Sequence, residues 1–188
     1  VYDRYNPMLD SIRASADSTD VLAVAQTLMD SLSVGAVYFT GLFPSGITVG
    51  PDLVVWRSGN CRELTDLVTY VFRALGIPGG CDKMLMRGDK NVAHYWNFVV
   101  DGEDSTYFAS IGQSSKQFAK ADTYWDPKGK VYRETFSLNR TMRDACGCDT
   151  ADVPPVFREP LMQDVTAAYT GRINRFLRIP VSYTHLTL

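Results

Sequence analysis

The chain has 188 residues, a formal net charge of −2, and a composition of 45% hydrophobic and 12% aromatic residues. This composition suits one globular domain together with a piece of another. A slightly acidic chain has no basic field with which to hold nucleic acid, so we expect a protein, peptide or small-molecule partner. No apolar run approaches the roughly 20 residues that cross a bilayer, so the sequence predicts no membrane span.

The N-terminal part of the chain predicts two helices. Residues 1–17 combine apolar and tyrosine side chains in a pattern typical of a helix that packs on the body. A second helix is expected to start near Thr19-Asp20, with Ser18 or Asp20 as its cap. Its apolar residues cover almost the whole circumference, which predicts burial. They are Val21, Leu22, Val24, Ala25, Leu28, Met29 and Leu32.

Glycine and proline recur through residues 35–55, which we expect to form loops near the functional end of the domain. Trp56 follows these loops. Its indole either forms a wall of a substrate cleft or is an aromatic residue of the core or rim. We therefore treat Trp56 as a candidate substrate-binding residue.

Residues 59–77 predict a core helix that begins at Cys61. A Gly59-Asn60 turn starts the helix, Gly76 ends it, and Pro78 prevents its continuation. The apolar residues recur at helical spacing on one face. They are Leu64, Leu67, Val68, Val71, Phe72 and Leu75.

Cys61 is a candidate nucleophile because of this position. The unpaired N–H groups and the positive dipole end of a helix N-terminus favour a thiolate. Asn60 is a second candidate, since the backbone N–H groups of residues 60 and 61 are placed to hold an oxyanion.

Three segments rich in β-formers follow, at about 83–86, 93–100 and 106–111. A meander of these strands returns His94 across the cysteine end of the helix. Side chains alternate along a strand, so His94 and Trp96 share one face of the sheet and Tyr95 and Asn97 the other. Trp96 then either lines the site or supports His94 from below.

The helix that starts at Cys61 ends Arg73-Ala74-Leu75-Gly76-Ile77-Pro78, and a strand with His94-Tyr95-Trp96-Asn97 follows. This combination resembles the transglutaminase-like superfamily of papain-type cysteine enzymes, over about residues 56–111. The resemblance implies an α+β fold, with N-terminal helices and the nucleophile helix packed on an antiparallel sheet.

The same resemblance implies a catalytic triad in which Cys61 is the nucleophile and His94 is its base. In the family, an aspartate on the following strand orients the imidazole, just after an aromatic residue. Ala109 or Ser110 occupies the corresponding position here. Ser110 is the candidate orienting residue, because its hydroxyl can hydrogen-bond the ring.

The implied chemistry is acyl transfer from a peptide or carboxamide through a thioester. We favour hydrolysis by a protease or amidase over crosslinking, because no acidic pocket for an amine is visible. Two alternatives stay open: a catalytically degenerate binding module, suggested by the missing aspartate, and an interaction domain of a larger surface protein. A papain-family protease fits less well, because its histidine lies much further from the cysteine.

The remaining cysteines predict neither a metal site nor a cofactor. Cys146 and Cys148 form one pair with no second pair to complete four ligands, and Cys81 is expected to be a buried apolar residue. His94 is the one usable histidine, because His185 lies in a segment that we set aside. No loop spaces oxygen ligands as a calcium site requires.

The C-terminal part predicts a boundary. Residues 131–138 resemble a strand, the proline-containing stretch 149–160 resembles a linker, and residues 163–169 resemble the first strand of a following module. We therefore expect a domain at 1–150 and a linker with a truncated module at 151–180. Residues 181–188 resemble a translated sequencing adaptor.

The N-terminus begins at Val1, without methionine or a signal sequence, as expected of a piece of a longer protein. A secreted or cell-surface setting is favoured over a cytoplasmic one.

Overall fold

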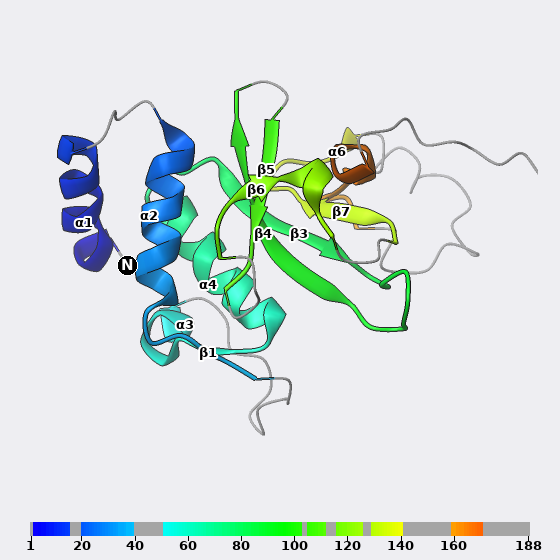
Figure 1. Ribbon diagram of the computed structural model, residues 1–188, viewed down its shortest axis with the longest axis horizontal. Helices are drawn as coiled ribbons and strands as arrows, with labels where there is room; N and C mark the ends of the chain where they lie inside the picture. The colour runs from blue at the N-terminus through cyan, green and yellow to red at the C-terminus, as the bar shows by residue number, and fades with distance from the viewer. Residues whose placement is uncertain are drawn as a thin grey trace, which may run out of the picture.

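The computed structural model describes residues 2–15, 20–39, 51–102, 105–111, 116–125, 129–140 and 159–170. These residues form a mixed α and β structure in which N-terminal helices pack on one side of an antiparallel sheet (Figure 1). Within them, no helix has both the length and the apolar character that a membrane crossing requires.

The described helices are α1 (Tyr2–Ser15), α2 (Val21–Ser33), α3 (Pro51–Trp56), α4 (Cys61–Ala74), the 3-10 turn η1 (Ala121–Thr123) and α6 (Thr166–Thr170). The main sheet has the strand order β6-β5-β4-β3-β7-β8. Its strands are β3 (Gly79–Met84), β4 (His94–Asp101), β5 (Ser105–Ala109), β6 (Ala119–Lys120), β7 (Val131–Glu134) and β8 (Met162–Asp164). A separate parallel pair joins β1 (Val37–Tyr38) and β2 (Ser58–Gly59).

The predicted N-terminal helices are confirmed. Helix α2 begins where expected, because the Asp20 carboxylate accepts a hydrogen bond from the Ala23 N–H at 3.0 Å. The expectation of loops throughout 35–55 is wrong in part, since β1 and the start of α3 lie in this stretch. Residues 40–50 lie outside the described residues.

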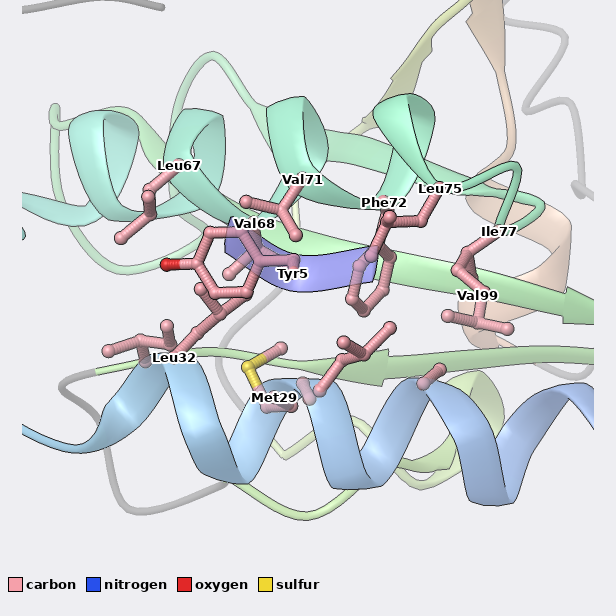
Figure 2. Packing of buried hydrophobic residues seen from close by; sticks show 14 of the residues in the cluster. Tyr5, Met29, Leu32, Leu67, Val68, Val71, Phe72, Leu75, Ile77 and Val99 are labelled. Carbon is pink, nitrogen blue, oxygen red and sulfur yellow. The ribbon is translucent and has the colours of Figure 1, made fainter. Parts of the chain in front are cut away.

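The main core lies between α2, α4 and the sheet (Figure 2). Met29 and Leu32 of α2 point toward the apolar face of α4, and Tyr5 of α1 lies over the same cluster. Burying each such side chain contributes about 1.5–3 kcal/mol relative to leaving it exposed. The fully buried α4 residues are Leu67, Val68, Val71 and Phe72.

Strands β4 and β5 are close to their predicted positions, and a turn with Gly102 at φ 70° connects them. Strand β3 begins at Gly79, earlier than predicted. A Cβ at Gly79 would lie 2.6 Å from the Phe98 carbonyl oxygen, so the close approach of the two strands requires glycine. Glycine is depleted in strands generally, which is why the sequence pattern placed the start too late.

The segment expected to begin a following module belongs to the same sheet. Strand β8 pairs with β7, with Met162 opposite Glu134. Only the first part of 163–169 is a strand, and α6 follows it. Met162 is 1% exposed and Tyr169 is 0% exposed. The elements β8 and α6, which were expected to follow the linker as part of a truncated module at 151–180, therefore pack on the same sheet as the preceding strands.

This C-terminal segment completes a second cluster of buried side chains, on the sheet face opposite α4. The sequence before β8 resembles a linker and does not indicate which strand β8 pairs with. Strand pairing joins residues that are distant in the sequence, so a local pattern does not show it. Cys146, Cys148 and residues 171–188 lie outside the described residues. The members of the cluster are Met84, Trp96, Phe108, Ala121, Tyr124, Val131 and Tyr169.

A truncation tests this correction. A chain ending at residue 158 lacks β8 and α6, so it exposes Met84, Trp96 and Val131 to water. We expect it to lose several kcal/mol of unfolding free energy and to bind a dye for exposed apolar surface. The matched control ends at Thr170 and keeps every described element. Equal urea-unfolding curves for the two chains would contradict the single-domain arrangement.

Candidate active site

The N-terminus of α4 is held by a reciprocal cap. The Asn60 side chain accepts hydrogen bonds from the N–H groups of Arg62 at 2.9 Å and Glu63 at 3.4 Å. In return, the Glu63 carboxylate accepts from the Asn60 N–H at 2.9 Å. A Cβ at Gly59 would lie 2.6 Å from Glu63 Oε2, so the turn before the cysteine requires a residue without a side chain.

This cap corrects the expected oxyanion donors. The Asn60 N–H is engaged by Glu63, which is 2% exposed, so it does not point into an open site. Of the two backbone donors expected from the sequence, the N–H of Cys61 is the one that this cap leaves available. Asn60 instead acts by fixing the first turn of the helix beneath the cysteine.

The surroundings of the Cys61 thiol act on its pKa in opposite directions. Burial raises the pKa of this thiol, hydrogen bonds from the N–H groups of Tyr95, Arg62 and Cys61 oppose the rise, and the Glu63 charge adds to it. The net pKa is raised, so the expectation that the helix end alone favours a resting thiolate is wrong. Burial outweighs the helix dipole here.

The N–H of Tyr95 is available because of the strand register. Val100 donates to the Pro78 carbonyl on the β3 side of β4 at 3.0 Å. Alternate residues point the other way, so the Tyr95 N–H points toward the β5 side. Within the described residues, the pairing of β4 with β5 runs from Asp101 to Asn97 and does not include Tyr95. The Tyr95 N–H therefore has no partner in the described part of β5.

Cys61 and His94 line the same pocket, which has a volume of about 570 Å³. His94 is the first residue of β4 and is 4% exposed. The structure thus places Asn60, Cys61 and His94 around one pocket. The other residues that line the pocket are Tyr38, Arg62, Arg87, Lys90, Val92, Ala93 and Tyr95.

Trp96 supports this site without lining it. The indole is fully buried and packs beside the His94 ring, with 5.6 Å between ring centroids. Trp96 was expected either to line the site or to support His94 from below, and in the structure it supports His94. A substrate cannot contact a side chain that is sealed in this way, so its assignment as a substrate-binding residue is corrected.

The two other candidates lie outside the pocket. Trp56 ends α3 and is 66% exposed, as a rim aromatic residue would be, but it is not among the residues that line the pocket with Cys61. Ser110 is 6% exposed, and its hydroxyl donates to the Ile111 carbonyl at 3.5 Å. Neither residue reaches the thiol in this arrangement.

A buried ionic network, which no local sequence pattern predicted, lies on the same sheet face as His94. Arg133 donates to both Asp82 carboxylate oxygens at 2.9 Å. The Tyr169 hydroxyl donates to Asp82 at 2.7 Å and accepts from the Trp96 indole N–H at 2.8 Å. A hydrogen-bonded chain therefore runs from Arg133 to Trp96, the residue against which His94 packs.

Asp82 is the acidic residue of this network. Its side chain is fully buried, which raises its pKa, while the hydrogen bonds and charge of Arg133 oppose the rise. The sequence signal was a charged residue in the middle of a strand, between Cys81 and Lys83. Its partners Arg133 and Tyr169 are too distant in sequence for a local pattern to show.

Metal chemistry has no visible ligand set in the described part of the chain. No group of three or more histidine, cysteine, aspartate or glutamate residues there is arranged to hold an ion. Cys81 is 1% exposed, and burial raises the pKa of its thiol well above the ordinary value. It is a buried residue of β3, as predicted.

Comparison with protein-family models, curated proteins and solved structures gave no match to this chain.

Removing the Asp82 charge should destabilise the fold. Asp82→Asn leaves the Arg133 guanidinium without its buried counter-charge, so we expect a loss of about 3–5 kcal/mol of unfolding free energy. The control is Lys130→Met, which breaks the Lys130–Asp164 pair, whose side chains are 51% and 39% exposed. That change should cost less than about 1 kcal/mol. Equal losses in urea unfolding would show that the Asp82 pair is not structurally important.

Proposed function

We propose that the domain performs cysteine-dependent acyl transfer, and most readily hydrolysis, on peptide or carboxamide bonds through a thioester. The observation that carries this proposal is the shared pocket of Cys61 and His94, with the Tyr95 N–H directed at the thiol. The motif resemblance to the transglutaminase-like superfamily supports the same chemistry. In that reading, α4 is the nucleophile helix and β4 carries the base.

The first half of the reaction depends on His94. Burial raises the pKa of the Cys61 thiol, so sulfur attack on the carbonyl requires that His94 accept the thiol proton. Carbon–sulfur bond formation gives a tetrahedral oxyanion, and in this proposal the N–H groups of Cys61 and Tyr95 are its donors. His94 then gives its proton to the departing nitrogen. The carbon–nitrogen bond breaks, and an acyl thioester remains on Cys61.

The second half releases the acyl group. Water attacks the thioester while His94 accepts a proton from it, and the carbon–sulfur bond breaks to return the Cys61 thiol and a carboxylic acid. Three cationic residues line the pocket, Arg62, Arg87 and Lys90, and none of its described lining residues is acidic. A lysine-type amine is therefore disfavoured there as the acceptor, which supports hydrolysis over crosslinking.

Trp96 and its network have a positioning role in this proposal. The indole packs against one side of the His94 ring, and Tyr169 holds the indole N–H. The network thus limits rotation of the imidazole from below. Ser110 remains a weaker candidate for an orienting residue, because its hydroxyl engages a neighbouring carbonyl.

A catalytically degenerate binding module is the second candidate. It is favoured by the raised pKa of Cys61 together with the absence of a carboxylate among the described residues that line the pocket. In this reading, the pocket holds a peptide without turning it over.

Thiol alkylation tests the pairing of Cys61 with His94. We expect iodoacetamide to label Cys61 at pH 7 and the His94→Ala variant to react about 10²-fold more slowly, because the buried thiol then lacks its base. Peptide mass mapping separates Cys61 from Cys81, Cys146 and Cys148. The control is Tyr70→Phe, on the exposed side of α4 and outside the pocket. The same rate in wild type and His94→Ala would contradict the catalytic pair.

Turnover separates the two candidate functions. With a library of glutamine-containing and other peptides, we expect the wild type to release amine or ammonia and Cys61→Ala to release none. Saturable peptide binding without turnover in the wild type, and with the same affinity in Cys61→Ala, would instead support the binding module. Mass spectrometry of the quenched reaction should also show the acyl adduct on Cys61.

A further inference from the structure

We infer that the pocket selects an acyl substrate that carries a carboxylate close to the carbonyl under attack, such as an acidic or C-terminal peptide residue. This inference rests on the proposed function and adds the substrate class. Its basis is the distribution of cationic side chains around Cys61, which the catalytic steps do not use. Arg62 and Lys90 are the residues assigned to carboxylate recognition.

The cations line the pocket from two different elements. Arg62 follows the nucleophile in the first turn of α4, whereas Arg87 and Lys90 lie on the segment between β3 and β4. The pocket that contains Cys61 and His94 is therefore bordered by positive charge from both the helix and the strand connection.

Arg87 is the least available of the three cations. Its Nε donates to the exposed Asp89 carboxylate at 3.0 Å. Lys90 also acts on Asp89, and both cations lower the pKa of that carboxyl, with the Arg87 hydrogen bond as the largest cause. One exposed carboxylate thus faces two cations, and Lys90 forms no ion pair within the described residues.

Arg62 is also able to bind an anion. Its guanidinium lies 5.5 Å from the centroid of the Tyr95 ring, and within the described residues it forms no ion pair. The nearby Asp66 carboxyl has a pKa raised to about 6 by burial, against the effect of the Arg62 charge, so at pH 7 it is a counter-charge near Arg62 but forms no ion pair with it. The Glu63 carboxylate is engaged by the Asn60 N–H. The planar guanidinium therefore retains donors for a bidentate contact with a substrate carboxylate.

These features also disfavour the opposite substrate class. A cationic group beside the scissile bond would meet Arg62 and Lys90 with like charge, in a pocket whose described lining contains no compensating carboxylate. An uncharged substrate would leave both cations solvated, so they would neither add to nor subtract from its binding free energy. A carboxylate is the common substrate group that can form ion pairs with both Arg62 and Lys90.

Two alkylating reagents of nearly the same size test the inference. Iodoacetate and iodoacetamide share the leaving group and differ in having a carboxylate or a carboxamide. Peptide mass mapping gives the rate at which each reagent labels Cys61. We take the ratio of the iodoacetate rate to the iodoacetamide rate, so that any change in thiol reactivity cancels. We expect the ratio to fall about tenfold in the Arg62→Gln/Lys90→Gln double variant, and to fall with added salt in the wild type.

The matched control is Lys120→Gln, an exposed lysine of β6 outside the pocket, which should keep the wild-type ratio. An equal ratio in wild type and the double variant would overturn the inference, even if both reagents label Cys61 rapidly. In that case the proposed function would stand, because iodoacetamide labelling alone reports on the Cys61–His94 pair.

A binding measurement covers the case in which Cys61 reacts with neither reagent. In Cys61→Ala, we titrate N-acetyl-alanyl-alanine as the free acid and as the amide, and follow the backbone resonances of Tyr95 and His94 by NMR. Tighter binding of the acid, lost in the added Arg62→Gln/Lys90→Gln changes, would support carboxylate recognition without catalysis. Equal binding of acid and amide would overturn it.

Discussion

The packing of α4 on β3 and β4 through Asn97 is the contact on which the candidate site depends. The Asn97 amide nitrogen donates to the Thr65 carbonyl at 3.0 Å and the Gly80 carbonyl at 3.2 Å. Its buried Oδ1 has no hydrogen-bond partner among the described residues, which costs about 1–3 kcal/mol. This amide therefore joins α4, which begins at Cys61, to strand β3 and to β4, which begins at His94.

The opposite face of the sheet supports the other half of the pair. Trp96 lies under His94, and Tyr169 and Asp82 hold its indole through a hydrogen-bonded chain. Tyr169 comes from α6, near the end of the described chain, while Asp82 comes from β3. The C-terminal segment therefore contributes to the site without contacting the pocket. Removing it affects His94 as well as the core.

The sequence predicted the parts of this arrangement that depend on local patterns. The cap at Asp20, the helix starting at Cys61 and the two faces of His94-Tyr95-Trp96-Asn97 all follow from spacing and backbone preference. The pairing of β8 with β7 does not, because it depends on contacts between segments distant in the sequence.

Burial explains the remaining differences between the predicted and the observed site. A helix N-terminus predicts a lowered thiol pKa, but the surrounding chain buries Cys61 and reverses the direction. The burial of Cys61 requires the tertiary structure. By contrast, the return of the Glu63 carboxylate to the Asn60 N–H is a local capping box between residues three apart, a pattern that is readable in the sequence.

The central claim is that Cys61 and His94 are close enough to exchange a proton, and a short bifunctional reagent tests it most directly. 1,3-Dibromoacetone alkylates a thiol and then a second nucleophile within reach of its three-carbon bridge. After digestion, the account predicts a crosslinked peptide that joins Cys61 to His94. Attachment to Cys61 alone, or a bridge from Cys61 to any other residue, would contradict the pair.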